Sequence, residues 1–400
     1  MITKYCTITL LAILLCCACS ESETTIVVPT ETGVAGSDDP RLTYGTLSED
    51  ASLQNEITTF SNHLISSIRT QRVIGGEMLI IKNGKVLLHK AAGWEDKENN
   101  QPLDLNKTYL IRDLNLLFNI SVLLKFVEDE KIDLCQPVAT YLTEFNTEKS
   151  QHITIEHLLR HTSGFTRRTF PKSPRSYDDI FQALKDRADE GPENQPGTVR
   201  KPRALNILIV KAILEVISGQ TYPNTIRDHL WNPLGMENTI IDINQNPSLL
   251  QNAISRYELH PDNSFTKKWQ NDRDQDYSYK WYSNDVYSTI VDYAIFLDMW
   301  INNGHHNETQ FVTENLIRYF KNVIYEPINA EDPDKCLFNE SVQTDDDNEI
   351  KPRYLATAPG PTIYASTSHK LIGLYFTQTT WNSSNHVFWT KMAALDNHFN

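Results

Sequence analysis

One stretch of the chain, between Leu114 and Val127, is apolar on nearly every side of a helix. Ten of its fourteen positions carry aliphatic or aromatic side chains, so the pattern predicts a buried helix. Asp113 comes just before it, where a carboxylate can accept hydrogen bonds from the first backbone N–H groups and face the positive end of the helix dipole. The charged segment 128–131 predicts the point where the helix leaves the core. We expect the fold to be built around this helix.

The rest of the chain alternates between strand-like and helical patterns. Two apolar runs in 77–89 flank Asn83-Gly84, which is typical of a β-hairpin with a type I′ turn. Further helices are expected at 52–69, 152–165 (closed by Gly164), 177–188, 205–218 (ended by Gly219), 224–230, 288–302, 313–320 and 387–395. Further strands are expected at 354–357, 362–366 and 371–378. Loops are expected at 262–282 and 330–352. Strands at both ends favour an α/β layer made from both termini, with a mainly helical insertion over roughly 110–300.

The N-terminus has the pattern of a targeting segment over residues 1–19. Lys4 precedes an apolar run from Ile8 to Cys17 that is too short to span a membrane. The run ends in Ala18-Cys19, which resembles the lipobox of bacterial lipoproteins, although an aliphatic residue is usual where Cys16 stands. This resemblance implies a lipid on Cys19; an ordinary cleaved signal and an uncleaved anchor are the alternatives. The expected location is the bacterial cell envelope, at the outer membrane.

The segment 20–48 is rich in Ser, Glu, Thr, Gly and Pro and has no apolar period, so it predicts a flexible tether. The folded domain is therefore expected over 49–400. It contains Cys135 and Cys336, and whether these two residues pair stays open.

Composition and charge narrow the functional classes. Hydrophobic residues make up 40% of the chain, which is typical of a globular protein. The formal net charge of −14 argues against nucleic acid as a partner, because phosphate binding needs a basic surface. The acidic run 345–349 matches no EF-hand loop, and the histidines show no metal-ligand spacing. We expect neither a metal nor another cofactor.

Seven short segments follow one another in an order that is specific as a set. They are Asn83-Gly84, 131–142 (ending Pro-Val-Ala-Thr-Tyr-Leu), 153–164 (ending His-Thr-Ser-Gly), Pro196-Gly-Thr198, Ile217-Ser-Gly-Gln220, 233–239 (beginning Pro-Leu-Gly-Met) and 287–297. Together they resemble the serine β-lactamase and penicillin-binding-protein-like superfamily, in its branch of class C β-lactamases, DD-peptidases and esterases. The resemblance covers roughly residues 50–400. It implies a β-lactamase-like α/β fold, with an antiparallel sheet flanked by helices, an all-α subdomain and a site at their junction.

The resemblance also implies three catalytic motifs. A Ser-x-x-Lys turn at the head of the buried helix supplies a nucleophile and an amine to take its proton. A Tyr-x-Asn loop adds a second proton carrier, and a Lys- or His-x-Gly strand helps to line the oxyanion hole. Carried onto this chain, the Ser and Lys positions fall on Asp113 and Leu116, and the Tyr and Asn positions on Pro202 and Ala204. The third motif would precede Pro361, where no Lys or His stands.

These residues cannot perform the chemistry of the family, because Leu116 cannot take a proton and Pro202 has no hydroxyl. We expect no catalytic residue, and a remnant cleft at Asp113, Leu116, Pro202 and Ala204 that binds a peptide, a peptidoglycan fragment or a protein partner. One alternative is an active serine hydrolase with a non-standard nucleophile, first of all Ser264 in Ser264-Phe-Thr-Lys267. A second alternative is a ligand-free scaffold whose cleft is filled by side chains.

Three other matches to catalytic patterns weigh less. Tyr222-Pro-Asn224 and Tyr282-Ser-Asn284 match Tyr-x-Asn outside the place where the family has it. His161-Thr-Ser163 corresponds to a structural turn of the family, so we expect a satisfied structural histidine there.

Overall fold

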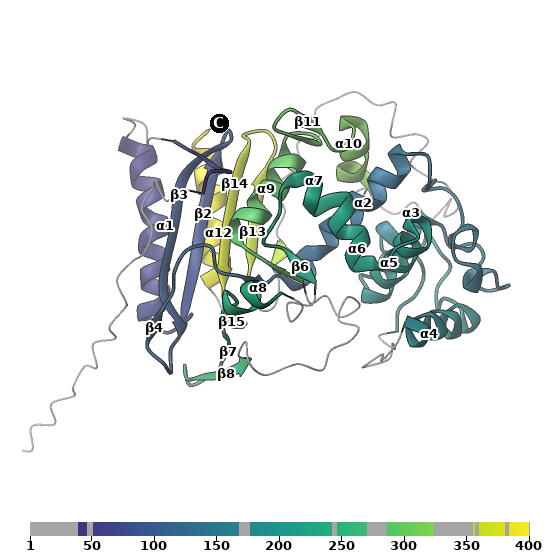
Figure 1. Ribbon diagram of the computed structural model, residues 1–400, viewed down its shortest axis with the longest axis horizontal. Coiled ribbons are helices and arrows are strands. Elements are labelled where there is room, and N and C mark those ends of the chain that lie inside the picture. Colours follow the sequence, from purple (N-terminus) through teal and green to yellow (C-terminus); the bar gives the residue numbers. More distant parts are fainter. Residues whose placement is uncertain are drawn as a thin grey trace, which may run out of the picture.

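A mixed sheet forms one half of the molecule (Figure 1). The computed structural model describes residues 39–45, 51–167, 177–241, 246–269, 286–323, 355–356, 360–380 and 384–399. The strand order is β1-β3-β2-β14-β13-β12, and β4 pairs with β3. The strands are β1 (Thr43–Tyr44), β2 (Gly75–Lys82), β3 (Lys85–Asp96), β4 (Gln101–Pro102), β12 (Leu355–Ala356), β13 (Thr362–Ser366) and β14 (Leu371–Thr377). Segments from both ends of the chain therefore build this sheet.

The hairpin of β2 and β3 confirms the turn that the sequence predicts. Asn83 and Gly84 have φ angles of 51° and 72°, and a type I′ turn needs positive φ at both positions. All strand pairs of this sheet are antiparallel except β1 with β3, which is parallel. The expectation of an antiparallel sheet was wrong at this edge, because residues 43–44 add a strand there.

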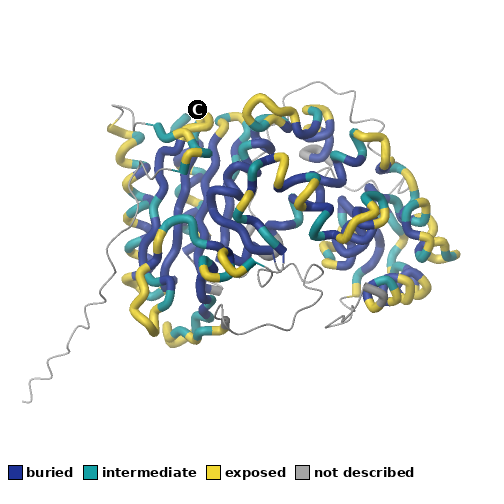
Figure 2. Tube along the Cα trace, viewed as in Figure 1, coloured by how far each residue is buried: buried dark blue, intermediate teal, exposed yellow. Residues whose placement is uncertain are grey.

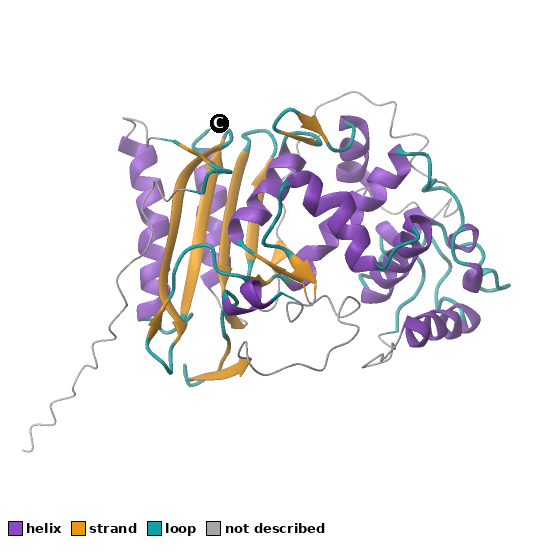
Figure 3. Ribbon diagram, viewed as in Figure 1, coloured by secondary structure: helices purple, strands orange, loops and turns teal. Residues whose placement is uncertain are grey.

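Helices cover both faces of the sheet (Figures 1 and 3). Helices α1 (Ala51–Arg69) and α12 (Ser384–Asn397) pack on one face and on each other, whereas α9 (Ile290–Ile301) packs on the other face. The side chains between α1, α12 and the sheet form one hydrophobic cluster, which includes Phe60, Phe388 and Tyr375. Figure 2 shows the buried strands between these layers.

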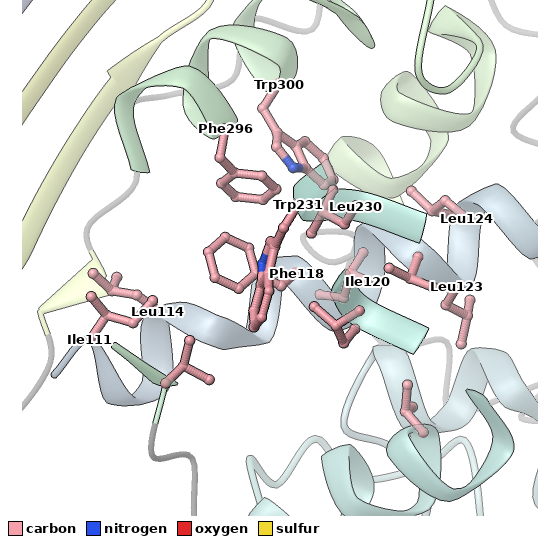
Figure 4. Packing of buried hydrophobic residues seen from close by; sticks show 14 of the residues in the cluster. Ile111, Leu114, Phe118, Ile120, Leu123, Leu124, Leu230, Trp231, Phe296 and Trp300 are labelled. Atoms are coloured by element: carbon pink, nitrogen blue, oxygen red, sulfur yellow. The ribbon is translucent and has the colours of Figure 1, made fainter. Parts of the chain in front are cut away.

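The second half of the molecule is helical and is centred on α2 (Leu116–Glu128), which follows the 3-10 turn η1 (Arg112–Asn115). The other elements of this half are η2 (Val138–Thr140), η3 (Thr143–Phe145), α3 (Ile155–Leu159), α4 (Tyr177–Glu190), α5 (Ala204–Ser218), α6 (Tyr222–Ile226), the π-helical turn η4 (Arg227–Trp231), α7 (Asn232–Leu234) and α10 (Glu314–Val323). Helix α2 contacts α5, α6 and η4. Figure 4 shows that Phe118 of α2 packs between Trp231 and Phe296.

Short elements join the two halves. They are β5 (Tyr109–Leu110), β6 (Ile240–Ile241), α8 (Pro247–Gln251), β7 (Arg256–Leu259), β8 (Phe265–Trp269), β9 (Val286–Ser288), β10 (His305–His306), β11 (Thr309–Gln310) and β15 (Thr379–Thr380). Strand β5 pairs with β9 and leads directly into η1. The start of α2 is thereby fixed at the junction between the sheet and the helical half.

Three local expectations were wrong. Asp113 lies inside η1 and is not the cap of the α-helix, because the N-cap of α2 is Asn115. Helix α3 ends at Leu159, and Gly164 stands beyond it, because His161 already takes a positive φ of 57°. Residues 265–269 form β8, although 262–282 was expected to be a loop; β8 has its hydrogen-bonding partner in β7. The charged run 345–349 lies outside the described residues.

The residues just before α1 belong to the fold and not to a free tether. Arg41 donates to Asp292 of α9 at 2.7 Å and to the carbonyl of Gly235 at 3.1 Å. Burial raises the pKa of the Asp292 carboxyl, although Arg41 and Thr239 lower it. The expected tether over 20–48 is therefore too long by the segment 39–45, and residues 1–38 lie outside the described part of the chain.

Two further observations concern the cysteines and the membrane. Cys135 is disulfide-bonded, and its partner lies outside the described residues, which contain no other cysteine. Within the described ranges, no single helix is long and apolar enough to cross a membrane, and the bent pair Ala204–Ser218 with Tyr222–Leu234 meets the criteria of length and composition only together.

Candidate functional site

The four residues expected at the remnant cleft come from two segments, the η1–α2 corner and the start of α5. Asp113 lies in η1, and its side chain is outside the described set. Leu116 opens α2 and is half-buried, whereas Pro202 and Ala204 are exposed. Helices α2 and α5 pack against each other. Leu116, Pro202 and Ala204 have no side-chain group that can donate, accept or transfer a proton.

The first turn of α2 is held by apolar packing and by one hydrogen bond from the sheet side. Ile111 and Leu114 point toward the sheet at this corner, and both are buried (Figure 4). The Tyr293 hydroxyl of α9 donates to the carbonyl of Leu114 at 3.0 Å. The corner between η1 and α2 is therefore firmly supported.

A buried polar network crosses from α2 to α6, and the sequence analysis missed it. The Tyr222 hydroxyl donates to Asn119 Oδ1 at 2.5 Å, and Asn119 Nδ2 donates to the carbonyl of Asn115 at 2.9 Å. The backbone N–H of Tyr222 donates to Glu215 Oε1 at 2.5 Å, and Lys211 Nζ lies 4.8 Å from the centre of the Tyr222 ring. The signal in the sequence was the polar residues that interrupt two apolar helices.

This network stabilises the packing of three helices, and its tyrosine hydroxyl does not act as a base. Burial raises the pKa of the Tyr222 hydroxyl far above its ordinary value, so the hydroxyl keeps its proton. The hydroxyl donates to Asn119, and the neutral carboxamide of Asn119 cannot take up its proton. The network therefore joins α2, the end of α5 and the start of α6.

The turn at His161 holds the segment that leads to Pro202 and Ala204. Ser163 Oγ donates to Asn206 Oδ1 at 2.6 Å, and Asn206 Nδ2 donates to His161 Nδ1 at 3.0 Å. The backbone N–H of Lys201 donates to the carbonyl of His161 at 2.7 Å. His161 and Ser163 are thus used in positioning a loop, as expected for a structural turn. Burial, and then the charge of Arg200, lower the pKa of His161 to about 4.

The geometry around Ser264 does not form a serine–lysine pair. Ser264 is exposed and its Oγ donates to Asp262 Oδ1 at 2.6 Å. Lys267 Nζ instead pairs with Asp96 Oδ2 at 2.7 Å. Residues three apart in an extended chain point to opposite faces, so the amine cannot reach the hydroxyl as it does across one helical turn.

The remaining matches have no catalytic geometry in the described structure. Tyr222 of Tyr222-Pro-Asn224 is buried in the network above. Tyr282-Ser-Asn284 and residues 357–359, next to the expected third motif, lie outside the described residues. Within the described ranges, no three His, Cys, Asp or Glu side chains lie together so that they could hold a metal.

Comparison with known proteins identifies the family. Residues 56–322 match the family described as Beta-lactamase, so the chain belongs to the beta-lactamase family. The chain is 28% identical over 168 residues to the teichoic acid D-alanine hydrolase of Staphylococcus aureus, a match that covers 42% of this chain and 41% of that protein. The chain thus spans less than half the length of this relative.

Solved structures show the same fold over most of the chain. EstCE1, a hydrolase with promiscuous acyltransferase activity, superposes with a TM-score of 0.69 and 15% identity, covering 86% of this chain and 99% of EstCE1. FmtA from Staphylococcus aureus superposes with a TM-score of 0.62 and 17% identity, covering 89% of this chain and 91% of FmtA. These likenesses confirm the β-lactamase-like α/β fold that the sequence predicts.

The low pKa of His161 predicts a loss of stability on acidification. The unfolded chain binds a proton at the ordinary pKa of 6.5, whereas the native imidazole stays neutral down to about 4. The unfolded state therefore binds more protons between these values, and stability falls as the pH falls through this window. At pH 5, His161 alone should lower the free energy of unfolding by about 2 kcal/mol relative to pH 7.5. Urea unfolding at both pH values measures this loss.

Two variants test whether His161 causes this loss of stability on acidification. His161→Asn tolerates the positive φ and should reduce the loss on acidification by about 2 kcal/mol. Ser163→Ala removes the neighbouring hydrogen bond but keeps the imidazole, so it should be less stable at both pH values with the wild-type loss between them. If the free energy of unfolding falls equally in the wild type and in His161→Asn, His161 does not cause the loss of stability.

Proposed function

We propose that this protein is a beta-lactamase-family member without serine acyl-transfer activity, which binds a peptide, a peptidoglycan fragment or a protein partner in its remnant cleft. The observation that carries the proposal is the set of residues at the family's catalytic positions. The firmly supported helix α2 begins with Leu116, and the segment before α5 offers Pro202 and Ala204. None of these three residues can serve as nucleophile or base.

The exposure of the cleft residues favours binding over a closed scaffold. Pro202 and Ala204 are exposed, and Leu116 is half-buried, so a ligand can reach this surface. Apolar side chains at these positions offer packing area, and a ligand's polar groups can meet the backbone at the start of α5, where the first N–H groups of a helix have no partner within the helix.

The alternative of an active hydrolase needs a nucleophile next to a base. Ser264 lacks the base, because Lys267 is paired with Asp96. Ser163 is fully buried and its hydroxyl donates to Asn206, which cannot take up the proton that an attack would release. Among the described serines with family-like motifs, neither has the geometry that acyl transfer requires.

A fluorescent penicillin tests the loss of acyl transfer. The full-length protein, incubated with the probe and separated under denaturing conditions, should carry no covalent label, because no activated hydroxyl is present at the head of α2. A serine β-lactamase labelled in parallel shows that the probe reacts. Covalent labelling that disappears in Ser264→Ala, or in another single-residue variant, would establish the active alternative.

A bulky residue at the start of α5 tests ligand binding in the cleft. Soluble muropeptides should bind the wild type, and Ala204→Trp should weaken this binding at least about tenfold, because an indole would occupy exposed space at the cleft. Val216→Trp is the matched control, since Val216 is exposed on the same helix in its last turn. Equal muropeptide binding by both variants and the wild type would place the ligand elsewhere.

The lipid anchor is a separate part of the proposal and rests on Ala18-Cys19. We infer that Cys19 carries the lipid and attaches the protein to the bacterial envelope, at the outer membrane. Cells grown with labelled palmitate should incorporate label into the wild type, and Cys19→Ala should remove both the label and the membrane association. Cys17→Ala keeps the neighbouring sequence and serves as control. Labelling that persists in Cys19→Ala would contradict a lipid at this position.

A further inference from the structure

A cavity lies at the end of the sheet where α1 and β3 end. It measures about 300 Å³ and is lined by residues from the end of α1, the turn before β2, the end of β3 with its following turn, and Phe265 of β8. The labels β4 and β8 mark this end of the sheet at the lower edge of Figure 1. No lining residue belongs to η1, α2 or α5, so the cavity is built from different elements than the remnant cleft.

Two aromatic rings form walls of this cavity. Trp94 and Phe265 are both half-buried, so each keeps part of its ring open to solvent. The backbone N–H of Trp94 donates to the carbonyl of Ile74 at 3.2 Å, and Gln378 Nε2 donates to the carbonyl of Trp94 at 2.7 Å. The pairing of β3 with β4 shifts register between Trp94 and Asp96, and such bulges redirect a side chain out of the regular pleat.

Three polar side chains, those of Gln71, Lys97 and Asn100, line the same cavity. Gln71 and Asn100 make no side-chain hydrogen bond, and Lys97 no ion pair, to any other described residue. Lys97 Nζ lies 5.3 Å from the centre of the Phe265 ring, which places the cation at the aromatic wall. Gln71 and Asn100 both have a φ of 53°, an uncommon conformation for glutamine in particular.

Lys97 is the one cationic side chain among the residues that line the cavity. Lys267 Nζ lies 2.7 Å from Asp96 Oδ2 and 3.4 Å from Glu98 Oε2, so its single charge offsets one of the two carboxylates beside Lys97. The Tyr257 hydroxyl accepts from the backbone N–H of Lys97 at 2.9 Å and donates to Glu98 at 2.5 Å. These contacts hold the turn that carries Lys97 against β7, so the site needs little ordering when a ligand binds.

We propose that this cavity binds a single sugar ring that carries a carboxylate. The apolar face of a pyranose packs on an aromatic ring. The carboxamides of Gln71 and Asn100 each offer donors and an acceptor, which suits hydroxyl groups. Lys97 supplies the cation for the carboxylate, in a chain whose net charge of −14 otherwise repels anions. The volume is at the small end of ligand pockets, which suits one ring and not an extended chain.

Ligand-observed NMR on the full-length protein tests the proposal with three probes. Glucuronate has the ring and the carboxylate, glucose only the ring, and acetate only the carboxylate. Glucuronate should show saturable binding, about five- to tenfold tighter than glucose, because only glucuronate pairs with Lys97. Acetate should show no saturable binding. Failure of glucuronate to saturate, or acetate binding as tightly as glucuronate, would overturn the proposal.

Three variants separate the contributions of the lysine cation and the aromatic ring to sugar binding. Lys97→Gln should weaken glucuronate to the level of glucose and leave glucose unchanged, whereas Phe265→Ala should weaken both sugars. Lys85→Gln removes the same charge from the opposite end of β3 and should change neither affinity. Lys97 is exposed, so its replacement leaves the fold intact, and thermal unfolding checks Phe265→Ala. Glucuronate binding that survives Lys97→Gln and Phe265→Ala would overturn the assignment to this cavity.

Discussion

The burial of α2 is the constraint on which the rest of this structure depends. A helix that is apolar on nearly every side can be stable in water only if other elements surround it. Here α9, α5 and η4 do so, and Phe118 packs within 6.0 Å of Trp231 and 4.7 Å of Phe296, measured between ring centres. Because α9 also packs on the sheet, the same contacts join the two halves of the molecule.

This constraint explains how the architecture of the beta-lactamase family is held in place at the head of α2. The position of η1 follows from pairing of β5 with β9 and from the hydrogen bond between Tyr293 and the Leu114 carbonyl. Neither contact involves a catalytic group. Catalytic sites often hold strained or uncompensated charge, so apolar replacements there tend to stabilise a fold. Leu116 fits this account, as it packs partly against the main core.

Polar groups of the helical half hold its elements in position. Asn119, Tyr222 and Glu215 connect α2, α5 and α6, and Ser163, Asn206 and His161 hold the loop before α5. The polar side chains of the described structure that share a cavity and make no side-chain hydrogen bond or ion pair lie instead at the far end of the sheet, beside Trp94 and Phe265. Ligand binding at this end would leave the surface around Leu116 and Ala204 free for another partner.

The sequence by itself determined the elements that depend on local pattern. The helix of 114–127, the turn at Asn83-Gly84 and the end of α5 at Gly219 follow from periodicity and backbone preference, which neighbouring residues decide. The ordered motifs indicated the family, and counting along them predicts that Asp113, Leu116, Pro202 and Ala204 stand at its catalytic positions.

The tertiary structure decided what depends on distant residues. The docking of Arg41 on Asp292, the pairing of β8 with β7 and the network from Asn119 to Tyr222 join residues that are far apart in the chain. The cavity beside Trp94 combines residues from 68 to 265. No local pattern encodes such contacts, because their free energy comes from burial and pairing that exist only after the chain has folded.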